Sequence, residues 1–101
     1  MAYTIKDPDD VIDFKFDWSG HLALLVGGPD TIDTSSFALV TAGSGMAIES
    51  EANDDDSATV WLSGGYDDGK VHYVSNTIVT VGGRTMKAMR GFITKKRSVE
   101  T

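Results

Sequence analysis

Residues 11–18 alternate between apolar and charged side chains, and this alternation constrains the fold more than any other stretch. One parity carries large apolar side chains, at Ile12, Phe14, Phe16 and Trp18. The other parity carries the charged side chains of Asp13, Lys15 and Asp17. Successive side chains of a β-strand point to opposite faces, so the segment predicts a strand with an aromatic and a charged face. Burial stabilises by roughly 1.5–3 kcal/mol per large apolar side chain, so we expect the aromatic face in the core.

Further short segments with strand patterns follow, separated by glycine-rich or acidic turns. They cover residues 31–43, 45–52, 57–65, 70–81 and 84–97. Gly82-Gly83 between the last two segments is the signature of a tight hairpin. The sequence does not decide which parity of residues 84–97 faces inward, because a bulge near Gly91 would exchange the two. The apolar run 21–26 fits either one helical turn or a short buried strand.

These patterns predict an all-β fold, an Ig-like antiparallel β-sandwich of about six to seven strands. A chain of 101 residues is large enough for one domain with its own core. We expect an extended N-terminal arm over residues 1–10, a sandwich domain over 11–97 and a C-terminal tail over 98–101. No apolar run has the length of a membrane span, and the first residues lack the pattern of a secretory signal, so we expect synthesis in the cytoplasm and no membrane partner.

Charge is divided unevenly along the chain. Residues 1–83 contain 14 acidic residues and three lysines, a net charge of −11, whereas residues 84–101 contain six basic residues and one acidic residue, a net charge of +5. This asymmetry suits head-to-tail pairing of copies or a basic tail on an acidic neighbour. An acidic body repels phosphate, so we do not expect a nucleic-acid partner.

The chain offers no recognisable catalytic or cofactor-binding pattern. It has no cysteine, its serines lack a nucleophile-elbow context, and its two histidines, His21 and His72, stand fifty residues apart. The acidic runs at 53–56 and 66–70 lack the ligand order of a calcium loop and indicate turns. We therefore expect no catalytic residue, no cofactor and no metal, and interpret the chain as a binding or assembly module.

Three stretches together resemble the fiber-tail adaptor proteins of tailed bacteriophages. They are IKDPDDVIDFKFDWSGHLA at 5–23, DDDSATVWLSGG at 54–65 and NTIVTVGGRT at 76–85. Two features depart from the family pattern: His21 stands where a tryptophan is usual, and LLVGGPDTI at 24–32 contains extra residues. The resemblance implies a non-enzymatic virion protein, located in the neck or tail, that joins fibres or neighbouring rings to the tail. It implies phage neck, tail or fibre proteins as partners and defines no catalytic residues.

Candidate interface residues come from the charge pattern. The charged face of the first strand, Asp13, Lys15 and Asp17, and the basic end, Lys95, Lys96 and Arg97, are expected to contact partners, as is the arm over residues 1–10. Contacts between an acidic body and a basic last strand predict a ring-like homo-oligomer. Two other functions fit a β-rich acidic domain: a capsid decoration or cement protein, and a carbohydrate-binding module with Trp18, Trp61 and Tyr66 as stacking platforms.

Overall fold

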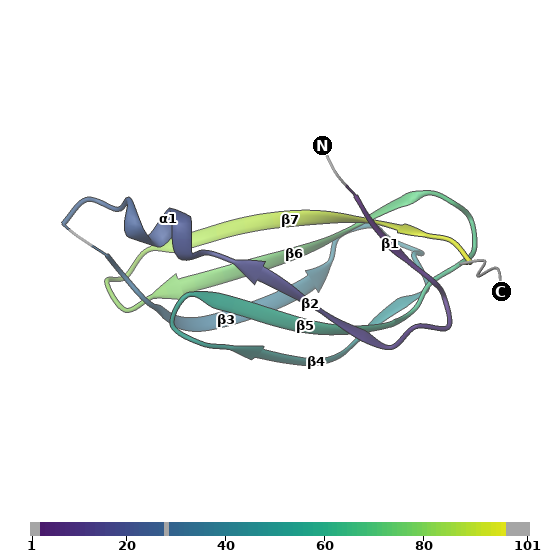
Figure 1. Ribbon diagram of the computed structural model, residues 1–101, viewed down its shortest axis with the longest axis horizontal. Coiled ribbons are helices and arrows are strands. Elements are labelled where there is room, and N and C mark those ends of the chain that lie inside the picture. The colour runs from purple at the N-terminus through teal and green to yellow at the C-terminus, as the bar shows by residue number, and fades with distance from the viewer. Residues whose placement is uncertain (1–2, 28, 97–101) are drawn as a thin grey trace, which may run out of the picture.

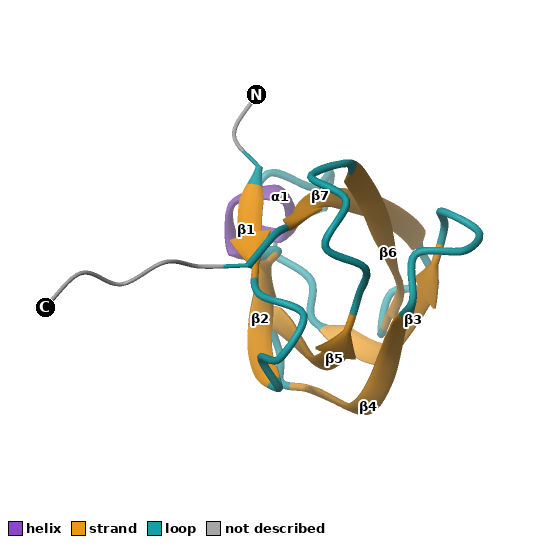
Figure 2. Ribbon diagram, turned by 90° about the vertical axis from the view of Figure 1, so that its right-hand side faces the viewer, coloured by secondary structure: helices purple, strands orange, loops and turns teal. Residues whose placement is uncertain are grey.

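The computed structural model describes residues 3–27 and 29–96, which form two β-sheets packed face to face (Figure 1). Sheet A has the strand order β1-β7-β6-β3, and its strands are β1 (Thr4–Lys6), β7 (Thr85–Thr94), β6 (Val71–Thr80) and β3 (Ile32–Leu39). Sheet B has the order β2-β5-β4, with β2 (Ile12–Asp17), β5 (Ser57–Gly64) and β4 (Met46–Asn53). Seen along the long axis in Figure 2, the strands of both sheets enclose one core. The predicted all-β sandwich is confirmed.

Strand order relates this sandwich to immunoglobulin domains. The orders β7-β6-β3 and β2-β5-β4 are those of the G-F-C and B-E-D strands in such domains. Here β1 pairs in parallel with β7, whereas every other strand pair is antiparallel. The narrower Ig-like assignment stays a prediction.

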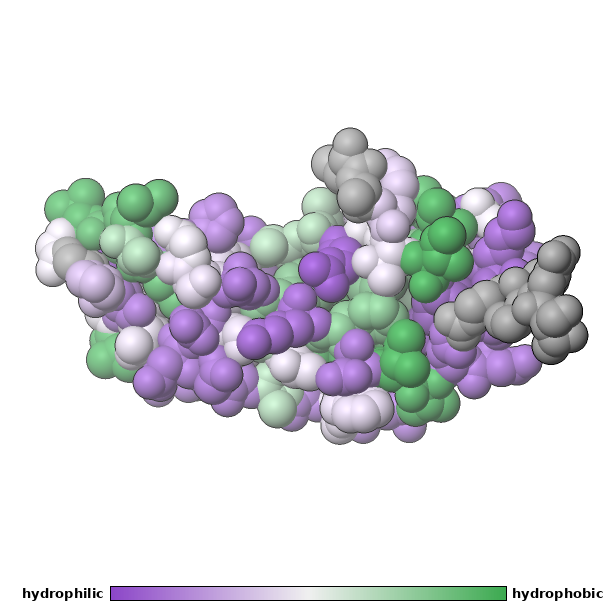
Figure 3. All heavy atoms as spheres, viewed as in Figure 1, coloured by the Kyte–Doolittle hydropathy of each residue, from purple (hydrophilic) through white to green (hydrophobic). Residues whose placement is uncertain are grey.

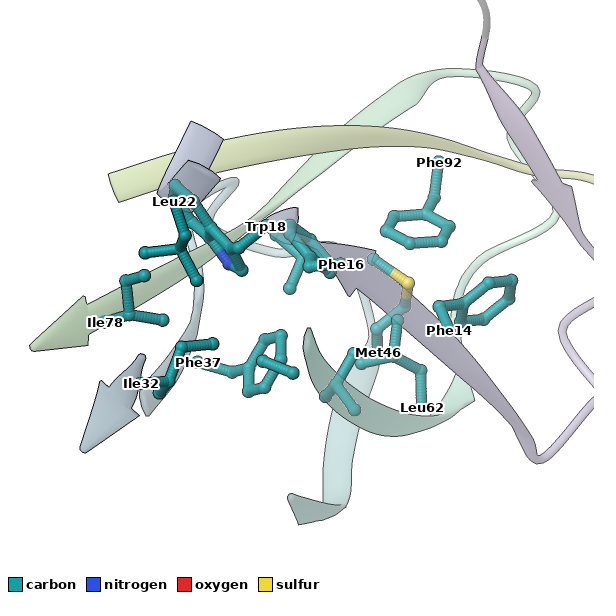
Figure 4. Packing of buried hydrophobic residues seen from close by; sticks show 13 residues of the cluster. Phe14, Phe16, Trp18, Leu22, Ile32, Phe37, Met46, Leu62, Ile78 and Phe92 are labelled. Atoms are coloured by element: carbon teal, nitrogen blue, oxygen red, sulfur yellow. The ribbon is translucent and has the colours of Figure 1, made fainter. Parts of the chain in front are cut away.

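The core is built from the alternating strand that opens the sequence. Phe14, Phe16 and Trp18 are buried, as predicted. The ring of Phe14 packs edge-on against Phe92 of β7 at 4.6 Å, and the ring of Phe16 packs against Phe37 of β3 at 5.4 Å (Figure 4). These contacts join β2 of sheet B to β7 and to β3, the two strands that flank β6 in sheet A.

A buried hydrogen-bond chain also crosses the core. The indole Nε1 of Trp18 donates to Asn76 Oδ1 at 2.7 Å, and Asn76 Nδ2 donates to Ser35 Oγ and the carbonyl of Ser36 at 2.9 and 3.0 Å. Asn76 is fully buried on β6. Its amide oxygen accepts from Trp18 and its amide nitrogen donates to Ser35 and Ser36, so both ends of the amide have partners within the protein. The bond from Trp18 fixes how β2 lies over β6 because buried polar groups must keep their partners.

The two segments left open by the sequence are now defined. Residues Ser19–Ala23 form the short helix α1, so the ambiguous apolar run begins as a helical turn, and Leu22 is its buried residue. In β7 the even-numbered residues face the core up to Phe92 and Thr94, and the pairing of β7 with β6 continues without a bulge at Gly91. Tyr3 lies where a side chain at Gly91 would stand, so a bare backbone is required there.

The hairpin between β6 and β7 is present but wider than the predicted two-residue turn. Thr80 N donates to the carbonyl of Arg84 at 2.8 Å, which leaves residues 81–83 as the loop. Gly83 has a φ of 88°, a conformation that glycine adopts without strain. The Arg84 side chain then donates to Asp30 Oδ2 and to the carbonyl of Val26, both at 2.7 Å, and ties the loop after α1 to this hairpin.

Part of the expected N-terminal arm belongs to the sandwich. Residues Thr4–Lys6 pair with Phe92–Thr94 as β1, and Lys6 is fully buried. Its Nζ donates to the carbonyls of Gly64 at 2.6 Å and Asp7 at 3.0 Å, and burial lowers the pKa of this amine. The expected tail over 98–101 lies outside the described residues. Among the described residues, no helix combines the length and apolar character that crossing a bilayer demands.

Replacing Asn76 by alanine tests the core hydrogen bonds. We expect Asn76→Ala to lower the free energy of unfolding by about 2–4 kcal/mol, because it leaves the Trp18 indole N–H buried without a partner and removes the hydrogen bonds to Ser35 and Ser36. Urea unfolding monitored by tryptophan fluorescence measures the loss. Asn53→Ala, at an exposed asparagine of β4, should change the free energy of unfolding by less than about 0.5 kcal/mol. An equal loss of stability in both variants would show that the buried hydrogen bonds of Asn76 do not stabilise the fold.

Candidate docking surface

The charged face of β2 lies on the outer side of sheet B, as the alternation predicted. Asp13, Lys15 and Asp17 are all exposed, and β2 is the edge strand of this sheet. Figure 3 shows hydrophilic side chains across the middle and lower part of this side of the molecule, where β2 crosses in front, and hydrophobic groups gathered at the upper left and right of centre. Lys15 between two carboxylates gives the strand an alternating charge pattern with an acidic excess.

Asp17 is fixed at the end of β2 by the start of α1. Its Oδ1 accepts a hydrogen bond from Ser19 N at 2.9 Å. Hydrogen bonds from the Ser19 side chain and backbone lower the pKa of Asp17. This carboxylate therefore stays negatively charged and holds one position on the surface.

Trp61 is the large aromatic side chain of the outer face of sheet B. It pairs with Asp13 on β2 and with Ser50 on β4, and 41% of its surface is exposed. Its neighbours two residues away on β5 are Thr59 and Ser63, which are too small to cover an indole. An exposed tryptophan among polar residues is the kind of anchor found at the centre of protein interfaces.

β4 adds two carboxylates with different roles. Glu49 lies on the outer face, where its Oε2 accepts a hydrogen bond from Ser63 Oγ at 2.6 Å. Glu51 turns towards β3 and its Oε1 accepts from Phe37 N at 2.9 Å, which caps a backbone group at the edge of sheet A. Glu51 therefore protects a strand edge, whereas Glu49 extends the acidic outer face.

The basic candidates lie on the other sheet. Lys95 and Lys96 follow β7, are exposed, and are held through their backbones: Lys95 N donates to the carbonyl of Lys6, and Lys96 N donates to Asp67 Oδ1. Arg97 lies outside the described residues. The two predicted groups of interface residues are thus on different layers of the sandwich and do not form one site.

The acidic turns use their carboxylates to hold the backbone. Asp54 Oδ1 accepts from Asp56 N, Ser57 N and Ser57 Oγ at 3.1, 2.8 and 2.8 Å, and these bonds lower its pKa to about 2. Asp68 accepts from Lys70 N at 2.9 Å. Residues 3–27 and 29–96 contain no cluster of three acidic or histidine side chains that would hold a metal ion.

The histidines belong to separate environments. His21 is exposed on α1, with its ring 5.8 Å from that of Trp18. His72 is buried on β6, where its Nε2 lies 3.1 Å from both carboxylate oxygens of Asp68, and Thr94 Oγ1 donates to the same carboxylate. The arrangement bridges β6, β7 and the turn before β6.

The aromatic set expected for carbohydrate stacking is not assembled. Trp18 is buried, with 4% of its surface exposed, whereas Trp61 and Tyr66 are 41% and 61% exposed. The Trp18 expectation fails because its ring fills the core and its N–H is taken by Asn76. A small groove of about 180 Å³ between β2, α1 and β7 exposes the edge of this core, and Arg90 lies across it, 5.3 Å above the ring of Phe16.

The sequence did not point to Glu49 as part of this candidate surface, nor to the central position of Trp61 on it. The sequence predicted Trp61 as a stacking platform for carbohydrate, and its place opposite Asp13 depends on the β2–β5 register. That register requires pairing between segments more than forty residues apart. The only local signal was the parity of Trp61, opposite to that of Val60 and Leu62.

Comparison with families of known proteins gives a match over most of the chain. The family described as "Podophage GP4 fiber-tail adaptor protein gp77" matches residues 6–89. The match spans β2 to the middle of β7 and so includes the whole outer face of sheet B. No curated protein matches the chain.

Acid titration tests the role of the Asp54 turn. The folded state holds the pKa of Asp54 near 2, below its ordinary value of 3.8, so its stabilising contribution is complete above about pH 4 and is lost as the pH falls towards 2. We expect Asp54→Asn to lower the free energy of unfolding at pH 5. The further decrease in stability between pH 4 and pH 2 should be smaller than in the wild type, as measured by urea unfolding at each pH. The matched control is Asp55→Asn, whose carboxylate accepts no hydrogen bond within the described part of the chain; an identical profile in both variants would contradict the assignment.

Proposed function

The chain belongs to the podophage GP4 fiber-tail adaptor family, and we propose that it is a non-enzymatic structural protein of the virion that joins fibres, or a neighbouring protein ring, to the tail. The family match over residues 6–89 is the observation that carries this proposal. The neck or tail is accordingly its proposed location, after assembly in the host cytoplasm.

The surface chemistry fits an assembly role. A docking surface needs side chains fixed in position, a large apolar anchor and charges that select the partner. The outer face of sheet B offers Trp61 as anchor and Asp13, Lys15 and Asp17 as charged groups on a hydrogen-bonded strand. We assign this face, with the basic residues Lys95, Lys96 and Arg97, to protein contacts within the virion.

Segregation of charge supports several copies around the tail. Sheet B carries four carboxylates and one lysine, whereas the strands of sheet A carry one carboxylate, that of Asp33, and the three cations Lys6, Lys87 and Arg90. Opposite charges on the two layers allow unlike faces of neighbouring copies to meet. Such unlike contacts close into a ring when the rotation between copies divides a full circle.

Virions that lack this chain test the adaptor role. We expect phage grown with the gene inactivated to form filled heads and tails without fibres, and to regain fibres when the protein is supplied from a plasmid. Negative-stain electron microscopy counts the fibres, and quantitative gels of wild-type particles give the copy number. A copy number in the hundreds, with density on the head lattice, would assign the chain to capsid decoration and overturn the proposal.

A further inference from the structure

Building on the proposed function, we infer that copies of this chain associate through the two outer faces of the sandwich. The acidic face, the outer side of sheet B around Trp61, Asp13 and Glu49, contacts the basic face of the next copy. The basic face is the outer side of sheet A around Met89 and Lys87, and Lys87 is the one basic residue that β6 and β7 direct outward. The occupant of the acidic face is therefore a second copy of the same protein.

The acidic face combines an exposed indole with an excess of negative charge. Trp61 stands at the centre of the three strands, with Asp13 directly across on β2 and Ser50 across on β4. Asp17 and Glu49 add two carboxylates to the same side, against the single positive charge of Lys15. A partner suited to this face needs an apolar group to cover the indole and a cation beside it.

The basic face supplies both groups on one strand. Met89 is 59% exposed, and Lys87 lies two residues away on the same side of β7. Their partners on β6 are Ser75 and Thr77, which are small and leave the methionine and lysine standing above the sheet. Methionine adapts to aromatic surfaces and contacts them favourably through its sulfur.

Spacing and symmetry match the two faces. Residues two apart on a strand are separated by roughly 7 Å, and directly paired residues on neighbouring strands by roughly 5 Å. A copy that places Met89 on Trp61 therefore brings Lys87 within reach of Asp13 or Glu49. The faces belong to opposite layers of the sandwich, as seen end on in Figure 2, so each copy contacts two neighbours through unlike surfaces.

Charge exchange tests the contact in the purified full chain. We expect Asp13→Lys and Lys87→Asp each to weaken self-association at least about tenfold, measured by sedimentation velocity at low and high salt. The double variant, in which the contact between positions 13 and 87 again joins opposite charges, should recover to within about threefold of wild type. Trp61→Ser should weaken association and remove little stability, since the residue is exposed. Circular dichroism and urea unfolding confirm that each variant is folded.

Lys15→Glu provides a control with the opposite sign. It makes the acidic face more negative, so we expect stronger association, which general damage to β2 would not produce. An oligomer that none of these variants weakens overturns the assigned faces and leaves the adaptor role intact. A wild-type chain that stays monomeric overturns the self-association as well. If Trp61→Ser removes fibres from virions without altering the oligomer, a fibre protein occupies the face and the inference is wrong.

Discussion

The hydrogen bond from the Trp18 indole to Asn76 is the constraint around which this sandwich is arranged. The apolar side chains of the core attract one another without direction, and many relative placements of the two sheets would bury them. A buried amide with three partners permits far fewer placements, because each lost partner leaves a polar group without water or protein to bind. The bond links β2 with β6, and through Ser35 and Ser36 it extends to β3. Sheet B thereby keeps one orientation over sheet A, and the exposed faces keep theirs.

Much of this fold could be predicted because the alternation of residues is a local property. The strand at Ile12–Asp17, its buried aromatic face and the turns at 53–56 and 66–70 followed from neighbouring residues alone. The helical turn at Ser19–Ala23 could not be assigned, since a few apolar residues fit a helix and a strand equally well. Burial of Lys6 was also missed, because a lysine enters the interior only when distant carbonyls, here that of Gly64, accept its hydrogen bonds.

The candidate surface was predictable in its residues and less so in its arrangement. Asp13, Lys15 and Asp17 lie where the parity placed them. Their proximity to Trp61 depends on which strands become neighbours and in what register, and the irregular pairing of β4 between Ile48 and Ser50 changes which residues of that strand face outward. Bulges of this kind are decided by packing on both sides of a sheet, so local sequence carries little information about them.

Parallel pairing of β1 with β7 has a consequence for how the protein is made. Residues 4–6 find their partners only at residues 92–94, so the first strand waits until nearly the whole described chain has left the ribosome. Pairings this distant in sequence are slow to form because a long loop must close first. In the folded chain the buried amine of Lys6 donates to the carbonyl of Gly64, so this second contact of the first strand also joins it to a residue far away in the sequence. Sheet A is therefore complete only when the first and the last strands of the chain have met.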